Sequence, residues 1–159
     1  MIIKKKWLYG GIILIVVVAG WLLFGGNKQT EVDVLNINLA EHKDLALHLH
    51  PHLTLTFNGE NLVIPAGIGL SEKGMRVIHT HETDGNLHIE SPYAHQFYLG
   101  DFFTIWGKRL TNECAFEFCT DEENILKFYV NGEESPLGPK IPLYDLDKIE
   151  MVYEKRGQS

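Results

Sequence analysis

Apolar and polar residues alternate along the chain from about residue 46, and this pattern limits the fold to one built mainly from β-strands. One face of the first extended segment is apolar and carries Leu47, Leu49, Leu53, Leu55 and Phe57. The other face is polar and carries His48, His50, His52, Thr54 and Thr56, and Pro51 interrupts the run. Asn58-Gly59 then offers a hairpin turn into a strand at residues 62–64.

Similar signals predict the remaining elements of an α+β domain. Further strands are indicated beside two more turn pairs and near the C-terminus: 77–83 and 86–90 around Asp84-Gly85, 126–130 before Asn131-Gly132, and 149–153. One short helix is predicted before Gly107, a residue type at which helices commonly end. Its apolar residues recur at helical spacing: Leu99, Phe102, Phe103 and Trp106. We expect a mainly antiparallel β domain with one short helix over residues 46–155.

The first part of the chain carries a different signal. Residues 7–24 form an uncharged apolar run, long enough to cross about 30 Å of hydrocarbon as a transmembrane helix. Three lysines precede the run, so the positive-inside rule places residues 1–6 in the cytoplasm and the rest of the chain outside. We expect a single-pass cell-membrane protein in which residues 25–45 link the anchor to the domain. The length of the run favours an uncleaved anchor over a removed signal peptide.

The charge of the exported part limits its partners. All 21 acidic residues follow the apolar run, together with 11 of the 14 basic ones, so this part has a formal charge of −10. Such a surface repels nucleic acid and attracts cations. We therefore expect a metal ion as partner, no nucleic acid, and membrane contact through the N-terminal helix.

Six of the eight histidines form two clusters: His48, His50 and His52, and then His79, His81 and His88. If Asp84-Gly85 is a two-residue turn, His81 lies opposite His88, and His79 lies opposite Glu90. Opposed side chains lie about 5 Å apart, and neighbours along one face lie about 7 Å apart. The second cluster and Glu90 are therefore predicted to converge on one face of a hairpin.

Three imidazoles and one carboxylate are a suitable ligand set for Zn²⁺ or Cu²⁺, and the general affinity order favours copper over zinc. His48, His50 and His52 would add nitrogen ligands if their strand pairs alongside the hairpin. Two other interpretations stay open: a solvated polar face that happens to use histidine, and a pH sensor, because clustered histidines titrate near neutrality. His42 and His95 lie outside both clusters and are predicted to be ordinary polar side chains.

Cys114 and Cys119 are the only cysteines, and an oxidising compartment favours a disulfide between them, with metal ligation and free thiols as alternatives. Asp101 is predicted to stabilise the start of the helix and not to act as a catalytic acid. The sequence has no GxSxG, P-loop, GxGxxG or HExxH motif. Hydrolase, nucleotide-binding and zincin functions therefore lack support.

Several segments resemble a family of small, His-rich, membrane-tethered or secreted bacterial and archaeal domains. The similar segments, over about residues 46–153, are HLHPHLTLTFNGENLVIPAGIGL, VIHTHETDGNLHIESP, YLGDFFTIWG and the Cys114/Cys119 pair before KFYVNGE. No activity is established for that family, so the resemblance implies only an exported, β-rich domain. Its motif often has Asp where this chain has Glu82, a side chain that the predicted register points away from the histidines.

The end of the chain is similar to β-grasp domains such as the sulfur-carrier proteins. The similarity lies in the order of a hairpin, a helix, a turn at residues 130–133 and a final strand. The chain ends in Gly157-Gln158-Ser159 and not in the Gly-Gly of those carriers. The resemblance therefore implies a β-grasp-like topology and no carrier function.

These observations favour a membrane-anchored, extracytoplasmic domain that binds copper, or zinc, in metal acquisition, delivery or tolerance. A metal-transfer protein is a candidate partner. One alternative is a metal-dependent enzyme or redox protein that uses the same ligands with an open coordination position. Another is a non-catalytic adhesion or assembly module whose histidines are incidental. Binding is favoured over catalysis because the chain lacks a recognisable catalytic motif.

Overall fold

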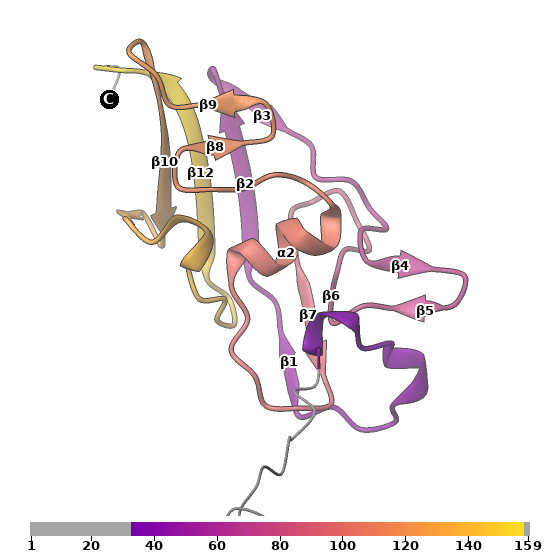
Figure 1. Ribbon diagram of the computed structural model, residues 1–159. Coiled ribbons are helices and arrows are strands. Elements are labelled where there is room, and N and C mark those ends of the chain that lie inside the picture. The colour runs from indigo at the N-terminus through magenta and orange to yellow at the C-terminus, as the bar shows by residue number, and fades with distance from the viewer. Residues whose placement is uncertain (1–32, 158–159) are drawn as a thin grey trace, which may run out of the picture. The chain divides into compact units, whose positions relative to one another are not determined.

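The computed structural model describes residues 33–157 (Figure 1). The predicted anchor at 7–24 and the predicted cytoplasmic segment 1–6 lie outside these residues. Within 33–157, no helix is both long enough and apolar enough to cross a bilayer. The described part is mainly antiparallel β-structure with one α-helix, as the alternation of the sequence predicts.

The larger sheet has five strands in the order β11-β10-β12-β2-β3. Its members are β2 (His52–Phe57), β3 (Glu60–Leu62), β10 (Asn124–Val130), β11 (Glu133–Glu134) and β12 (Lys148–Lys155). The last strand, β12, lies in the centre of the sheet, parallel to β2 and antiparallel to β10. The apolar face predicted for residues 53–57 is buried in the core.

Both Asn-Gly pairs form the predicted tight turns. Asn58-Gly59 joins β2 to β3, and Asn131-Gly132 joins β10 to β11. All four residues have positive φ, between 53° and 85°. These angles match the type I′ turn, in which Asn-Gly is the preferred pair.

A smaller sheet carries most of the clustered histidines. Its three antiparallel strands follow the order β1-β7-β6, namely β1 (Leu47–Leu49), β7 (His88–Ser91) and β6 (Ile78–His79). Two short ladders complete the β-structure: β4 (Leu70–Ser71) with β5 (Gly74–Met75), and β8 (Cys114–Ala115) with β9 (Phe118–Cys119). Figure 1 shows the chain leaving β1 in the smaller sheet and continuing into β2 of the larger one.

The first histidine run therefore crosses from one sheet to the other, and does not form one strand. β1 ends at Leu49 and β2 begins at His52, with Pro51 between them. Proline cannot donate a ladder hydrogen bond, so it commonly marks the end of a strand. The prediction that His48 and His52 share one strand face is wrong for this reason.

Asp84-Gly85 does not form the predicted two-residue hairpin. The predicted register puts His81 opposite His88, whereas in the structure His79 pairs with His88 and residues 80–87 form a longer loop. The register differs from the prediction by two residues. Because side chains alternate with a period of two along a strand, His79 and His88 keep the face that they were predicted to share.

Hydrogen bonds to other segments replace the tight turn. The Gly85 carbonyl accepts from the Leu53 amide at 2.9 Å, and the Thr80 hydroxyl donates to the Pro65 carbonyl at 2.8 Å. A Cβ at position 85, where φ is +85°, would lie 2.4 Å from the Leu53 oxygen. Glycine is therefore needed at this position for a close approach to β2, and not for a hairpin turn.

The predicted helix is confirmed as α2 (Leu99–Trp106). Asp101 Oδ2 accepts from the Tyr98 amide at 2.8 Å, which fits the predicted role of this carboxylate at the helix start. Gly107, with φ 69°, ends the helix in the left-handed conformation. The helix packs against β6 and against the 3₁₀ turn η3 (Gly138–Lys140), and it buries Leu99, Phe102 and Phe103.

The packed domain begins before residue 46. Two 3₁₀ turns, η1 (Val34–Asn36) and η2 (Leu39–Glu41), lie in the segment predicted as a linker. Ile37 and Leu39 are buried in the same core as the sheets. Residues from about 34 therefore belong to the folded domain.

Cys114 and Cys119 form a disulfide, as the even cysteine count favours. The bond joins β8 to β9. Phe116 and Phe118, between the two cysteines, pack on Phe57 of β2 with ring centroids 5.9 and 5.0 Å away. The disulfide thus fixes a small hairpin against the larger sheet, and its sulfurs are not free to bind metal.

Candidate metal centre

Strand β7 lies between β1 and β6, and this order brings histidines from three segments to one place. On one side, His79 of β6 pairs with His88 of β7. On the other side, His48 of β1 pairs with Glu90, so the next position on the same face, His50, falls beside His88. His88 therefore has a histidine neighbour on each side.

We call His79, His81 and His88 the inner triad. Each offers a ring nitrogen, and these nitrogens lie within 4.8 Å of one another. The ring centroids of His81 lie 4.8 Å from His79 and 4.6 Å from His88. With metal–nitrogen bonds of about 2 Å, two nitrogens on one ion are at most about 4 Å apart. Small side-chain rotations would therefore let the three imidazoles hold one ion.

His79 is the most constrained member of the inner triad, since its side chain is completely buried. Its Nδ1 lies 3.0 Å from the backbone carbonyl oxygen of Arg76. A carbonyl oxygen can only accept, so Nδ1 carries the proton and Nε2 has the free lone pair. Nε2 has no hydrogen-bond partner within residues 33–157. Burial also lowers the pKa of His79, so the neutral form is favoured.

A loop covers His79 closely. At Gly69, where φ is +73°, a Cβ would lie 2.4 Å from the Ile78 carbonyl oxygen and 3.1 Å from the His79 Cβ. The Ile68 amide of the same loop donates to the hydroxyl of Thr80, the residue that follows β6, at 3.1 Å. Glycine at position 69 thus allows this loop to lie close over His79 and to exclude water from it. We call the loop the cover of His79.

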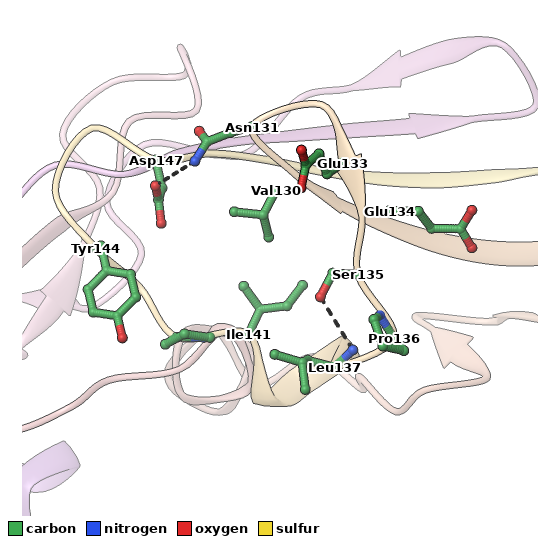
Figure 2. A pocket seen from close by; sticks show the side chains of 11 residues that line it. Val130, Asn131, Glu133, Glu134, Ser135, Pro136, Leu137, Ile141, Tyr144 and Asp147 are labelled. Carbon is green, nitrogen blue, oxygen red and sulfur yellow. Dashed lines mark hydrogen bonds between the residues drawn. The ribbon is translucent and has the colours of Figure 1, made fainter.

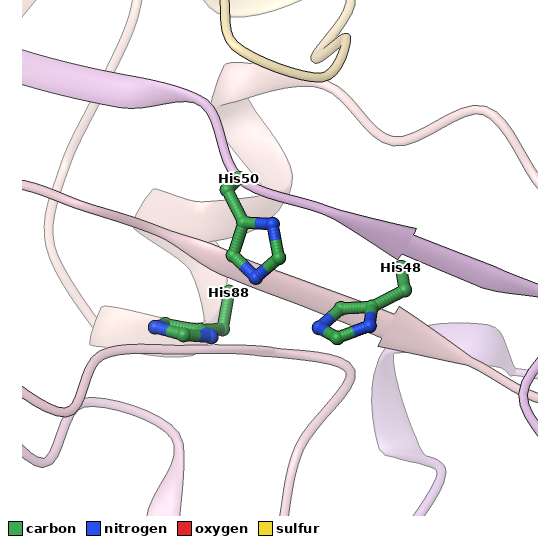
Figure 3. A group of neighbouring side chains, drawn as sticks. All are labelled: His48, His50 and His88. Carbon is green, nitrogen blue, oxygen red and sulfur yellow. The ribbon is translucent and has the colours of Figure 1, made fainter.

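We call His48, His50 and His88 the outer triad (Figure 3). Their ring nitrogens also lie within 4.8 Å of one another. The ring centroids of His50 lie 4.5 Å from His48 and 4.9 Å from His88. The side chains of His48 and His50 are 53% and 39% exposed, in contrast to the buried His79. The outer triad therefore lies at the surface, and His88 belongs to both triads.

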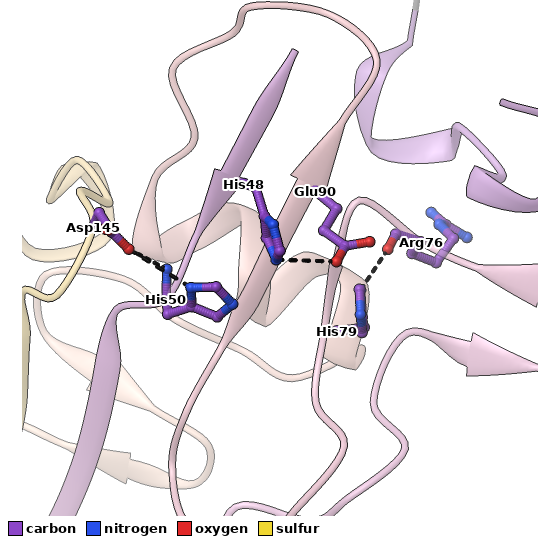
Figure 4. Close-up of polar contacts among 6 residues, drawn as sticks. All are labelled: His48, His50, Arg76, His79, Glu90 and Asp145. Carbon is purple, nitrogen blue, oxygen red and sulfur yellow. Dashed lines mark hydrogen bonds and ion pairs between the residues drawn. The ribbon is translucent and has the colours of Figure 1, made fainter. Parts of the chain in front are cut away.

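Two carboxylates flank the outer triad (Figure 4). Glu90 Oε1 lies 3.3 Å from His48 Nε2, and Asp145 Oδ1 lies 3.8 Å from His50 Nδ1. Asp145 also accepts from the His50 amide at 2.8 Å, which fixes this part of the chain. Both carboxylates favour a cation at the outer triad.

His88 carries the electrostatic consequences of its central place. Partial burial lowers its pKa, and the neighbouring His81 and His50 lower it further. A neutral imidazole has one N–H and one free lone pair. His88 is thus available as a ligand near neutral pH, through one nitrogen at a time.

Two residues of the predicted ligand set lie outside the triads. His52 Nε2 lies 2.8 Å from the Asp84 carbonyl oxygen, so this ring holds the 80–87 loop against β2. Glu90 is not among the clustered ligand atoms of the described chain, although its charge acts on both His79 and His88. His42 and His95 also lie apart from both triads, as predicted.

Asp145 was not found by sequence reasoning. It lies 95 residues after His50 along the chain, and β12 brings it close by running parallel to β2. An aspartate in a loop before a strand carries no signal of such a contact. The Arg76 carbonyl, which sets the tautomer of His79, could not be identified from the sequence either, because every residue has a backbone carbonyl.

Two of the hollows on the domain differ in their relation to the triads. One, of about 570 Å³, is lined by His50 and His52 together with residues of β2 and β12. The other, of about 550 Å³, lies between the end of β10 and η3 (Figure 2). Its lining within the described residues includes no histidine, so only the first hollow adjoins a triad.

Comparisons of the chain with protein-family models, with curated proteins and with solved structures find no match. The geometry of the two triads is therefore the basis for a functional assignment.

Proposed function

We propose that this protein is a membrane-anchored, extracytoplasmic domain that binds one transition-metal ion, copper in preference to zinc, through His79, His81 and His88. The observation that carries the proposal is the Nε2 atom of His79, which is buried and has no hydrogen-bond partner among residues 33–157. Leaving a buried polar atom unpaired costs about 1–3 kcal/mol. A metal ion bound at Nε2 would compensate for that cost.

The second ring nitrogen of His79 supports the same proposal. Histidines that bind metals usually donate their other N–H to a carboxylate, a backbone carbonyl or water, which fixes both the tautomer and the ring orientation. The contact from His79 Nδ1 to the Arg76 carbonyl is of this kind. The proton is thus already on Nδ1, and the lone pair of Nε2 is left for a metal ion.

The donor set bears on the choice of metal. Imidazole nitrogen suits Zn²⁺ and Cu²⁺, and the affinity order of the divalent ions favours copper where both are present. Three nitrogens leave a further coordination position for water or for a ligand from another protein. This arrangement suits acquisition, delivery or tolerance of the ion, with a metal-transfer protein as partner.

The location and the finer fold are part of the proposal. The apolar run at 7–24 and the lysines before it favour a single-pass anchor with the domain outside the cell membrane. The Cys114–Cys119 disulfide suits an oxidising compartment. The sheet order β3-β2-β12-β10-β11, with α2, further supports a β-grasp-like unit. In that unit, β4 to β7 are an insertion that carries the inner triad.

A metal titration of the full chain in detergent micelles, prepared without a histidine tag, tests the proposal. We expect about one Cu²⁺ or Zn²⁺ per chain, bound tightly enough to compete with a chelator. His79→Gln should weaken binding at least about 100-fold, the upper range for loss of a supporting contact at a metal site. His95→Gln is the matched control and should bind as the wild type does. Equal affinity of H79Q and wild type would refute the inner triad as the site.

A further inference from the structure

We propose that the outer triad is a second position for the same ion, which exchanges between outer and inner triads through their shared ligand, His88. This inference rests on the proposed function, since it describes how the ion reaches and leaves the inner triad. It differs from a chain with two independent metal sites. In that case each site would have its own ligands.

Sharing of His88 limits the occupancy. Both triads need a nitrogen from this residue, and a neutral imidazole has only one free lone pair. Binding two ions at once would require His88 to lose its remaining N–H proton. It would also place two divalent cations close together, where they repel strongly. One ion with two alternative positions is therefore the arrangement that the ligand count supports.

Exposure distinguishes the roles of the two positions. His48 and His50 are 53% and 39% exposed at their side chains, and His50 also faces the hollow of about 570 Å³ beside β2 and β12. His79, in contrast, is completely buried. His81 is exposed, so solvent also reaches one edge of the inner triad. The outer triad is the position that offers two accessible nitrogens to an arriving ion or to a partner protein.

The existing contacts of the imidazole nitrogens determine which triad should hold the ion more tightly. Glu90 and Asp145 attract a cation to the outer triad, but they also neighbour the imidazoles of His48 and His50 and compete for them. The Nε2 of His79 has no competitor within the described residues. Ligation at the inner triad therefore displaces fewer existing contacts. The ion should be captured at the outer triad and held more tightly at the inner one.

Stopped-flow loading of the full chain in detergent micelles with Cu²⁺, and release to a chromophoric chelator, test this inference. The test variant is His48→Gln with His50→Gln, at one exposed and one half-buried position, and the control is His42→Gln with His95→Gln. We expect the test variant to bind one ion with a Kd within about threefold of wild type, but to load and release it at least about tenfold more slowly. Equal slowing in both directions is the signature of a lost exchange position.

Each other outcome overturns a distinct part of the idea. Unchanged rates in the test variant would show that the outer triad is not an exchange position. Two ions on the wild type, with one lost in the variant, would show two sites held at the same time. A loss of affinity as large as that of H79Q would show a single site made of all five histidines. If the wild type binds no Cu²⁺, or H79Q binds it normally, the proposed function itself fails.

Discussion

His79 and His48 lie on strands that flank the same neighbour, β7, yet their surroundings are opposite. His79 is buried, its Nδ1 contacts a backbone carbonyl, and its Nε2 has no partner within residues 33–157. His48 is half exposed, and its Nε2 lies 3.3 Å from the Glu90 carboxylate. The Nε2 atom of His79 is thus free to bind an ion, whereas the Nε2 atom of His48 already has a charged neighbour. Spacing alone did not distinguish the two triads; burial and the contacts of the ring nitrogens did.

The largest loss of metal affinity is expected from a substitution at the residue that both triads share. His88→Gln deletes the ligand that both triads share, so neither retains three imidazoles. We expect Cu²⁺ affinity to fall about 1,000-fold, which is about 4 kcal/mol, and by more than in H79Q. Isothermal titration of the full chain would measure this. A smaller loss in H88Q than in H79Q would show that His88 is not shared.

A second substitution affects only the inner triad. Gly69→Ala places a methyl group 2.4 Å from the Ile78 carbonyl oxygen, at a position where φ is +73°. We expect the free energy of unfolding to fall by about 2–4 kcal/mol, from backbone strain together with the steric clash. The cover of His79 would be displaced, so Cu²⁺ affinity should fall as well.

Gly67→Ala is the matched control for this change. Its φ is +81°, but a Cβ there has no neighbour within 4 Å in the described chain. The free energy of unfolding should fall by only about 1–2 kcal/mol, and metal affinity should be unchanged. Equal effects of both substitutions, measured by urea unfolding and metal titration, would contradict a specific role for the cover.

The smallest expected effect is the dependence of the free energy of unfolding on pH. Burial is the main cause that lowers the pKa of His79 and His88 below the ordinary value of 6.5. Well above pH 6.5 both imidazoles are neutral in the folded and the unfolded chain, so they add no pH dependence. As the pH falls below 6.5, the unfolded chain takes up protons first, and stability decreases until the folded-state pKa values are reached.

Urea unfolding of the metal-free full chain between about pH 8 and pH 5 measures this dependence. His79→Gln should reduce the slope, because one of the two responsible groups is removed. His95→Gln, at an exposed position outside both triads, is the control substitution. A steeper slope in H79Q than in the wild type would contradict the assignment.

Much of the fold could be predicted from local sequence signals. The two Asn-Gly turns and the helix before Gly107 depend on residues close together in the chain, and all three were correct. The face that His79 and His88 share was also correct, although the register was wrong by two residues. A period of two makes the face insensitive to such an error.

The remaining features depend on contacts between distant segments. Asp84-Gly85 has the residues of a tight turn, but the hydrogen bond from the Leu53 amide to the Gly85 carbonyl was not visible in the sequence. The alternation across His48 to His52 continued through Pro51 without revealing the change of sheet. Asp145 reaches His50 only because β12 lies beside β2. These are tertiary effects that no local pattern records.

The Cys114–Cys119 disulfide also bears on the oxidation state of a bound ion. These are the only two thiols in the sequence, and both are in the bond. Thiolates are soft ligands that favour Cu⁺, whereas imidazoles suit the divalent state. With its thiol sulfurs in the disulfide, the domain offers its nitrogen and oxygen donors to an ion and no thiolate. In the proposed site, this donor set would favour Cu²⁺ and Zn²⁺ over Cu⁺.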